Sequence, residues 1–452
     1  MGIDDVRSAI ARRTDVHLDW LRTLCRIPGV SSRRYGIDAS VQAIRQLIEE
    51  IGGKVQVLQM ADANPVIFAE FDGDGERTLL FYNHYDIQPA EPLDEWTVPP
   101  FEGVVEAGLF YARGAADNKG DLVSRLAAID AWRQARGRLP CRVKFLIEGE
   151  EEIGSPSLPD YLRTYRDLFQ ADACIWKYGN RDPAGRLEVG LGLKGLLYVE
   201  LEVEIASSDL HSGYGALVEA ASNRLVRALA TLRDGRGQVL IPGFYDVVRP
   251  PGSEVRASLE ALPFEDEILR ARYGIRRFLS DRIRTGALAT LLLEPTCTFC
   301  GIESGHTGEG MRTILPKQAK AKVEFRLVPD QDPEVLVRQL RHHLDMKGFP
   351  DVQIRVLATQ RPHQTPINHE FVDTVKRAAE EETGREVVLY PTLQYSGRMY
   401  ELAEYLRLPV VSVGVGYWDR RAHAPNENIR LADFDETVRL MARLLQMFGE
   451  EG

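Results

Sequence analysis

The predicted strands of this 452-residue chain are of two kinds, and each kind occupies its own part of the sequence. Between about residues 55 and 175 the strand candidates are nearly continuous apolar runs: "VQVLQM", "PVIFAEF", "TLLFYN", "RVKFLIEG" and "ADACIW". A helical segment, "KGDLVSRLAAIDAWRQA", separates the third from the fourth. Such strands alternating with helices are typical of a mainly parallel sheet covered by helices. The sequence therefore predicts an α/β domain with a helix-flanked sheet.

A second strand pattern begins near residue 195. "LLYVELEVEIA" and "AKAKVEFRLV" alternate apolar with charged residues, which is typical of antiparallel strands with one solvated face. The first pattern returns after "RPHQTP", with the strands "VVLYP" and "PVVSVGV" and a final helix. We therefore predict a catalytic domain formed by residues 1–194 and 362–452, interrupted by a smaller α+β domain at 195–361. Helical periodicity predicts helices at 4–28, 38–51, 216–233, 264–280, 333–346, 369–384 and 399–406.

Charge and cysteine content limit the functions that this chain can have. Its formal net charge is −11 at pH 7, which argues against general nucleic-acid binding, since that requires a basic face. No apolar run approaches the length of a membrane span, and the N-terminal "MGIDDVRSAIARR" lacks the apolar core of a signal peptide. The five cysteines suit a reducing compartment, and we interpret the lone CxxC of Cys297 and Cys300 as two ordinary thiols. We expect a cytoplasmic protein with no membrane or nucleic-acid partner.

Side chains that bind metals follow several of the apolar strands. His84 and Asp86 come after "LLFYN", Asp117 lies in "ARGAADNKGD", and His423 lies in "RRAHAPNEN" after "PVVSVGV". Three glutamates at 150–152 follow "VKFLI". Each motif alone has a common structural explanation, as a surface hydrogen bond, a turn or a helix start. Because the carboxyl ends of parallel strands meet at one sheet edge, the motifs together favour a catalytic metal site with imidazole and carboxylate ligands.

These segments resemble the zinc metallopeptidases and deacylases that include carnosinase-type dipeptidases, succinyl-diaminopimelate desuccinylase, acetylornithine deacetylase and glutamate carboxypeptidase. The resemblance covers nearly the whole chain, through "NHYDIQPAEPLDEW", "YARGAADNKGD", "EGEEEIGS", "DLHSG", "TILPKQAKAKVEFRLVPDQDP" and "AHAPNEN". The segments "DLHSG" and "FRLVPDQDP" are similar to the dipeptidase branch. The resemblance implies that the inserted domain is a lid and dimerisation domain.

The resemblance also implies a role for each residue at the strand ends. Asp117 would bridge two zinc ions per subunit, or Mn²⁺ or Co²⁺ in their place, and its peptide bond to Asn118 would be cis. Asp86 would orient a ligand imidazole, Glu151 would be the general base and acid, and Glu150 would take no part. The implied metal ligands are His84, Asp117, Glu152 and His423.

A homodimer joined through the inserted domain is implied in the same way. His211 of the partner subunit would reach the active site and polarise the scissile carbonyl. The implied substrate-binding residues are Thr313, Arg326, His369 and Ser396. Arg326 suits a terminal carboxylate, because guanidinium binds carboxylate as a fork. From the residues alone, a surface or capping role explains His211, and a place on an alternating strand explains Arg326.

Lys177 departs from the pattern of these relatives. It follows "ADACIW", where they carry an aspartate or glutamate that binds a metal. An ammonium group has no lone pair, so we predict that one metal position is weakened or empty. Lys177 would take the place of the metal and pair with Asp117 or Glu152. The alternatives are that Asp182 supplies the carboxylate, that a carbamylated Lys177 is itself a ligand, or that the loop is misaligned.

We therefore predict a metal-dependent hydrolase that cleaves the amide bond of dipeptides or small peptides with metal-activated water. The first alternative is an N-acyl amino acid deacylase of the same family. The second is a homologue whose catalysis is impaired or lost, and Lys177 is the residue that favours it.

Overall fold

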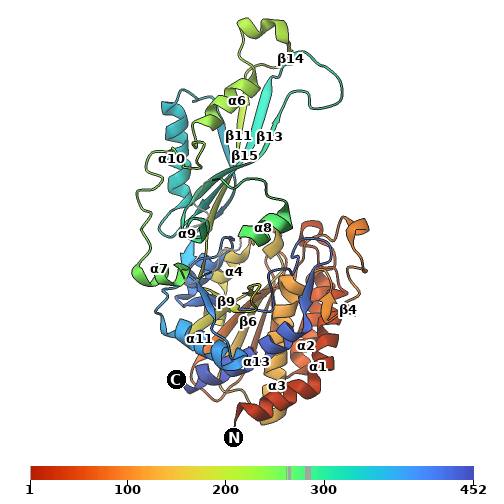
Figure 1. The fold of residues 1–452 in the computed structure, drawn as a ribbon. Helices are drawn as coiled ribbons and strands as arrows, with labels where there is room; N and C mark the ends of the chain where they lie inside the picture. The colour runs from red at the N-terminus through yellow and green to blue at the C-terminus, as the bar shows by residue number, and fades with distance from the viewer. Residues whose placement is uncertain (1, 261, 263–265, 280–286, 452) are drawn as a thin grey trace. The chain divides into compact units, whose positions relative to one another are not determined.

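The computed structural model describes residues 2–260, 262, 266–279 and 287–451 (Figure 1). The chain forms two compact units. The first comprises Met1–Gly192, Thr365–Pro391 and Glu401–Gly452, and the second comprises Leu193–Gln364 and Thr392–Tyr400. The second unit contains the predicted insertion at 195–361, and it also includes residues 392–400, which the sequence analysis assigned to the first domain.

A mixed sheet forms the centre of the first unit. Its strands in spatial order are β1 (Lys54–Leu58), β2 (Val66–Phe71), β6 (Arg142–Glu148), β3 (Thr78–His84), β7 (Ala173–Trp176), β19 (Val410–Ser412), β9 (Leu187–Gly190) and β18 (Val388–Tyr390), and β8 (Asn180–Arg181) pairs with β9. The central strands β6, β3, β7 and β19 are parallel, whereas β1 and β2 add antiparallel pairs at one side. The predicted α/β class is confirmed, with antiparallel strands outside the parallel centre.

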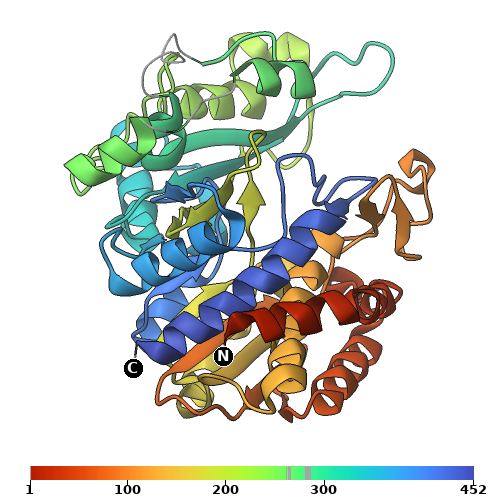
Figure 2. The ribbon, with the colours of Figure 1, turned by 60° about the horizontal axis from the view of Figure 1, so that its bottom comes forward.

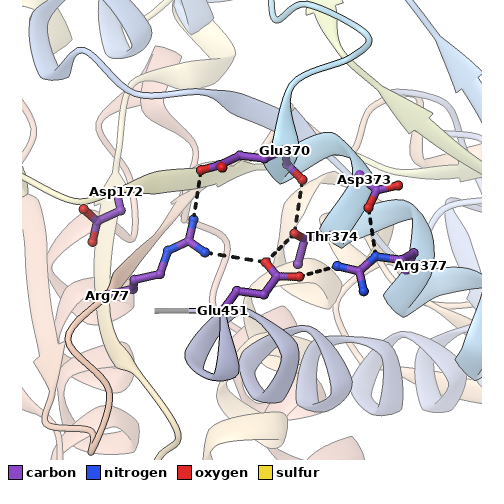
Figure 3. Close-up of a pocket in the computed structure, with 7 residues that line it drawn as sticks. All are labelled: Arg77, Asp172, Glu370, Asp373, Thr374, Arg377 and Glu451. Carbon is purple, nitrogen blue, oxygen red and sulfur yellow. Dashed lines mark hydrogen bonds and ion pairs between the residues drawn. The ribbon is translucent and has the colours of Figure 1, made fainter.

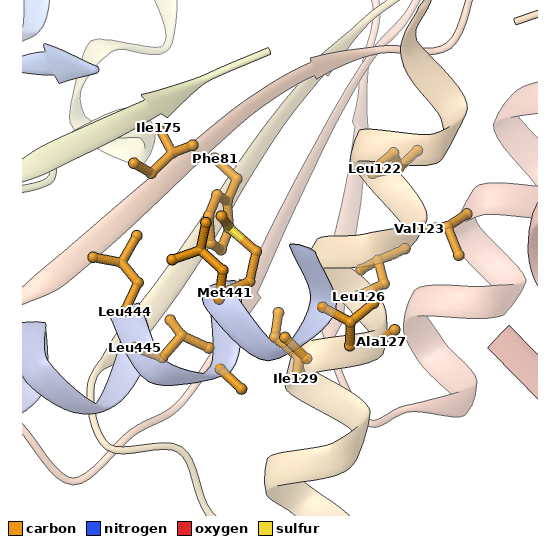
Figure 4. Packing of buried hydrophobic residues seen from close by; sticks show 14 of the residues in the cluster. Phe81, Leu122, Val123, Leu126, Ala127, Ile129, Ile175, Met441, Leu444 and Leu445 are labelled. Atoms are coloured by element: carbon orange, nitrogen blue, oxygen red, sulfur yellow. The ribbon is translucent and has the colours of Figure 1, made fainter. Parts of the chain in front are cut away.

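Helices cover one face of this sheet. They are α1 (Ile3–Cys25), α2 (Ile37–Glu50), α3 (Gly120–Arg136), α11 (Glu370–Thr383) and α13 (Leu431–Glu450). α1, α3 and α13 lie side by side, although α1 and α13 come from opposite ends of the chain (Figures 1 and 2). In Figure 4, Met441 of α13 lies beside Phe81 of β3, and apolar side chains of α3 join the same core. Each such fully buried side chain contributes ~1.5–3 kcal/mol.

The opposite face of the sheet is covered by α4 (Leu158–Thr164) and α5 (Arg166–Phe169). The Phe169 ring packs edge-on against Phe68 of β2, with 5.8 Å between centroids. Trp176 stacks on Tyr82 at 3.9 Å, which couples the ends of β7 and β3. A separate small sheet has the order β20 (Asn428–Arg430), β5 (Leu109–Tyr111) and β4 (Val104–Glu106). It brings the chain after His423 next to the chain before Asp117.

The second unit has an antiparallel sheet with the order β13 (Thr296–Ser304), β15 (Gln318–Leu327), β11 (Gly195–Glu204) and β16 (Gln353–Gln360). In β15, alternate residues from Ala319 to Leu327 are buried, as the sequence pattern predicts. α6 (Ala221–Ala230) and α10 (Pro333–Met346) pack on this apolar face. Further elements of this unit are α7 (Ser253–Glu260), α8 (Asp266–Tyr273), α9 (Ala287–Leu293), β12 (Leu210–His211) and β14 (Ile314–Leu315). Three more lie at points where the chain passes from one unit to the other: α12 (Met399–Leu406), β10 (Gly192–Leu193) and β17 (His363–Gln364).

Some predicted elements differ from the observed ones. The helix expected at 264–280 is observed as α8, and residues 264, 265 and 280 lie outside the described residues. α7, α9 and β13 were not predicted, because their sequences show no clear period. In the described part of the chain, every helix is too short or too polar to cross a bilayer. Cys297 is buried and Cys300 exposed, and both are free thiols.

Candidate metal centre

Parallel strands bring polar side chains to one edge of the first unit's sheet. β3 lies between β6 and β7, and its last residue, His84, pairs with Glu148 at the end of β6. Lys177 comes directly after β7, and the glutamates at 150–152 come just after β6. His84 therefore lies beside both segments, because neighbouring parallel strands end at the same edge.

Asp117 lies in the loop before α3, and buried hydrogen bonds hold that loop. The carboxylate of Glu427 accepts hydrogen bonds from Arg113 at 2.6 Å and from three backbone amides of the loop, including that of Asp117, at 2.9 to 3.0 Å. The side chains of Arg113 and Glu427 are both 1% exposed. The Asp117–Asn118 peptide bond is cis, as the resemblance implies. The sequence analysis gave Glu427 no role, although it lies in the same motif as His423.

Two charged residues of α3 also hold the site and were not identified from the sequence. Arg125 donates to the backbone oxygens of Tyr82 at 2.7 Å and Trp176 at 2.8 Å, so it connects the ends of β3 and β7. Asp121 accepts from the backbone amide of Tyr178 at 3.0 Å. Both side chains are buried. The available signal was the charge of these two residues within a largely apolar helix.

Asp117, Glu152 and His423 form a set of oxygen and nitrogen donors. Nε2 of His423 lies 3.1 Å from Oδ2 of Asp117 and 3.1 Å from Oε2 of Glu152. His84, Asp117 and Glu152 each place one potential ligand atom within 4.8 Å of the others. Within the described part of the chain, Oε1 of Glu152 is buried without a hydrogen-bond partner. A buried carboxylate oxygen with no donor fits a bound cation, and this donor set suits Zn²⁺.

The charges around this set support the same conclusion. Burial, followed by the nearby charge of Asp117, raises the pKa of Glu152. Burial opposes a charge on His423, but its hydrogen bonds with Asp117 and Glu152 outweigh burial and raise its pKa to about 10. Without a cation, the imidazolium supplies the positive charge between the carboxylates. A metal that binds here displaces this proton.

Asp86 contacts both His84 and the turn that contains Glu151 and Glu152. Nδ1 of His84 lies 3.0 Å from the backbone oxygen of Asp86 and 3.3 Å from its Oδ1. The Asp86 carboxylate accepts from the backbone amides of Glu151 at 3.2 Å and Glu152 at 3.0 Å. One buried side chain therefore places the imidazole and both glutamates. Glu150 instead accepts from the amide of Asn64 at 2.8 Å.

Lys177 points into the site. Its Nζ lies 2.7 Å from Oε1 of Glu151, 3.1 Å from Oδ1 of Asp117 and 3.1 Å from Nε2 of His84. Burial opposes the charge of the Lys177 ammonium, but Asp117 and the two glutamates at 151 and 152 outweigh burial and raise its pKa. The ammonium therefore stays charged at neutral pH.

The contacts of Lys177 and Asp182 distinguish between the alternatives considered for this position. Lys177 pairs with Asp117 as expected, but its second partner is Glu151 rather than Glu152, because the turn after β6 aims Glu151 at the end of β7. Asp182 does not supply a carboxylate to the centre. It accepts from the backbone amide of Arg186 at 2.8 Å and from the Arg186 guanidinium at 2.7 Å, within its own turn.

The predicted substrate-binding residues are divided between the units. In the second unit, exposed His211 lies on β12 beside β14, and the amide next to it, of Ser212, donates to the backbone oxygen of Thr313 at 3.0 Å. Arg326 donates to Ser396 at 2.7 Å, so these two residues also lie together. In the first unit, His369 caps α11, accepting from the amide of Phe371 at 3.1 Å.

A surface pocket elsewhere in the first unit contains no residue of the predicted site. It has a volume of about 530 Å³ and is lined by Arg77, Asp172, Glu370, Asp373, Thr374, Arg377 and Glu451 (Figure 3). Arg77 lies 3.6 Å from Glu370 and 3.5 Å from Glu451, and Arg377 pairs with Asp373 at 2.9 Å. Both arginines of this pocket are paired with carboxylates, and the pocket contains none of the groups of the donor set.

The sequence matches peptidase family M20/M25/M40 over residues 80–447, a range that includes the donor set described above. The chain belongs to this family. It is 30% identical over 396 residues to the Beta-Ala-His dipeptidase of Homo sapiens, covering 84% of this chain and 76% of the relative. It is 28% identical over 406 residues to the Cys-Gly metallodipeptidase DUG1 of Saccharomyces cerevisiae, covering 85% and 82%.

Solved structures agree with this assignment. A structure described as an M20 family metallo-carboxypeptidase from Sulfolobus solfataricus has a TM-score of 0.91 and 36% identity, and the match covers 96% of this chain and 99% of that chain. Human carnosine dipeptidase 1 has a TM-score of 0.83 and 26% identity, with 99% of both chains covered. The predicted family resemblance and the prediction of a peptidase enzyme are confirmed.

Proposed function

We propose that this M20 family member hydrolyses dipeptides or other small peptides with water activated by a divalent cation. The observation that carries the proposal is the convergence of Asp117, Glu152 and His423 beside Glu151 at the carboxyl edge of the sheet. The cation is Zn²⁺ by donor type, and Mn²⁺ or Co²⁺ are its alternatives. A cation at this position supplies a water of lowered pKa and polarises the scissile carbonyl.

Glu151 carries the proton in this proposal. It takes the proton of the attacking water and delivers it to the leaving amine, so that one carboxylate serves as base and then as acid. Its backbone amide is bound by Asp86, which keeps its side chain at the rim of the site. Asp86 also keeps the His84 imidazole in place.

Arg326 is proposed to bind the terminal carboxylate of the substrate, together with Ser396, Thr313 and His369. Arg326 already forms a two-pronged contact with a carboxylate, since its Nε and Nη2 each lie 2.9 Å from an oxygen of Glu324. A substrate carboxylate would displace Glu324 from this fork of donors. Ser396 would orient the guanidinium through its 2.7 Å hydrogen bond.

A homodimer joined through the predicted insertion at 195–361 belongs to the same proposal. His211 of the partner subunit would then support the developing oxyanion. The exposure of His211 in a single chain is consistent with such a role. The free thiols at all five cysteines are consistent with a cytoplasmic location.

A substrate panel tests the proposal. The purified protein is incubated with Zn²⁺, Mn²⁺ or Co²⁺ and with dipeptides such as β-Ala-His and Cys-Gly, a longer peptide, and N-acetyl amino acids. We expect release of amino acids from the dipeptides, and loss of this release with a chelator. Turnover of the acyl amino acids alone would replace the proposal with a deacylase.

A carboxypeptidase is the second candidate, and the 36% identity to the metallo-carboxypeptidase structure favours it. It would release only the last residue of the longer peptide. No hydrolysis of any substrate by metal-loaded protein would contradict both peptidase proposals and favour a non-catalytic homologue.

A further inference from the structure

The donor atoms around Asp117 form two sets, one on each oxygen of its carboxylate. On the Oδ2 side lie His423 and Glu152. On the Oδ1 side lie Nε2 of His84 at 3.0 Å and the ammonium of Lys177 at 3.1 Å. The two sets therefore differ: the first contains only groups that can bind a cation, whereas the second already contains a cation.

We propose that the Lys177 ammonium takes the place of one of two cations, so that this chain binds a single divalent cation through Asp117, Glu152 and His423. The proposal rests on the proposed function as a metal-dependent hydrolase. The family resemblance implies two zinc ions per subunit, and the side chains present fit one position and not the other.

Three atoms of the centre surround Nζ of Lys177. An ammonium group has three N–H donors and no lone pair. Carboxylate oxygens of Glu151 at 2.7 Å and of Asp117 at 3.1 Å accept hydrogen bonds from Nζ, and Nε2 of His84 lies 3.1 Å from it. Zinc ligands lie at about 2.0–2.2 Å from the metal, so a cation held by these same atoms would occupy the space of Nζ. Both cannot be present.

The backbone at Lys177 cannot easily move the side chain out of the site. The preceding residue, Trp176, is buried and stacked on Tyr82. The backbone oxygen of Lys177 accepts from Ser412 at 3.0 Å, and the next amide, that of Tyr178, donates to Asp121. The side chain is 10% exposed. Expelling it would leave a charge without its partners, in a packed environment.

The Lys177 ammonium and one divalent cation match the charge of the three carboxylates that face them. Asp117, Glu151 and Glu152 carry three negative charges when ionised. Lys177 and one divalent cation carry three positive charges between them. A second divalent cation would place two more positive charges beside the Lys177 ammonium, at a separation where the repulsion between like charges is strong. Lys177 thus completes the neutralisation and also holds Glu151 at the rim.

Metal stoichiometry and electron paramagnetic resonance test this inference. The parent is stripped with chelator, loaded with excess Mn²⁺, desalted and analysed for metal and for intact mass. We expect one Mn²⁺ per chain, the signal of an isolated ion, and a mass without a carbamate. Lys177→Glu and Lys177→Asp are expected to bind two Mn²⁺ and to show spin coupling, because paired metals lie about 3.5–4 Å apart.

Lys144→Met is the matched control. Lys144 is on β6 and donates to the backbone oxygen of Gln170 at 2.8 Å, so this variant removes a lysine from the same sheet without touching the centre. We expect one Mn²⁺ per chain. Two tightly bound ions in the parent, a carbamate on Lys177, or no second ion in either acidic variant would overturn the inference. One bound ion without hydrolysis of any substrate would contradict the proposed function and leave the inference standing.

Discussion

The backbone amide of Asp117 donates a 3.0 Å hydrogen bond to the carboxylate of Glu427, a residue 310 positions further along the chain. The same carboxylate binds Arg113, and both side chains are buried. The bond to Glu427 is made by Nη1 of Arg113, and its Nε and Nη2 have no hydrogen-bond partner among the described residues. The buried ion pair therefore helps to fix the backbone from which the Asp117 carboxylate extends.

Glu427→Gln is expected to lower both stability and metal affinity. The variant keeps a carbonyl acceptor but leaves the Arg113 charge buried without its partner, and breaking a buried ion pair costs ~3–5 kcal/mol. Denaturant unfolding and metal titration measure the two effects. Glu382→Gln is the control: it removes a buried carboxylate that pairs with Arg439 at 2.8 Å, and should destabilise the fold with metal affinity unchanged. Unchanged metal affinity in both variants would show that Glu427 does not position Asp117.

Glu151→Gln is expected to lose turnover and keep its metal. Removing a general acid and base typically costs ~10²–10⁴-fold in rate. Glu150→Gln is the matched control, because Glu150 accepts backbone amides of Asn64 and Ser157 and does not face the donor set. It should keep turnover within a few fold. Loss of the metal from Glu151→Gln would mean that Glu151 is a ligand.

Arg326→Met is expected to weaken binding of substrates that carry a free terminal carboxylate. A hydrogen bond to a charged group is worth ~1.5–3 kcal/mol, so KM should rise by ~10–100-fold, with a smaller change in kcat. The same substrates with an amidated terminus should show little change between parent and variant. Arg355→Met serves as control, because Arg355 pairs with Glu200 on the same sheet. Equal effects on acid and amide substrates would exclude carboxylate recognition by Arg326.

The stability of the fold should fall as pH rises through the titration of Glu148. Burial raises the pKa of Glu148 from its ordinary value of 4.5 to about 8, although Tyr82 and Ser155 donate hydrogen bonds to it. Between these two pH values the folded chain holds a proton that the unfolded chain has lost, so the free energy of unfolding decreases with pH. Glu148→Gln lacks this titration.

Between about pH 4.5 and 8, the free energy of unfolding of the parent should therefore fall relative to that of Glu148→Gln. Above about pH 8 the difference between the two proteins should stay constant. Denaturant unfolding at pH 5, 7 and 9 measures it, with both proteins free of metal. A constant difference across this range would show that Glu148 titrates normally in the folded chain.

The sequence by itself determined the class of the fold, the kind of chemistry at the site and the departure at Lys177. Strand patterns report local burial, so they distinguished the fully buried strand that ends at His84 from the half-exposed strand that contains Arg326. The identity of the side chains was sufficient to predict a metal site, since imidazole and carboxylate groups after several strands share one edge.

Only the tertiary structure decided how these side chains pair. It placed Lys177 on Glu151 rather than Glu152, kept Asp182 in its own turn, and made Glu427 the acceptor for the Asp117 loop. The contacts of Lys177 with Glu151 and of Asp117 with Glu427 join residues 26 and 310 positions apart. The physical reason is that periodicity records which face of a segment is buried, whereas the partner of a buried charge depends on the packing of distant segments against one another.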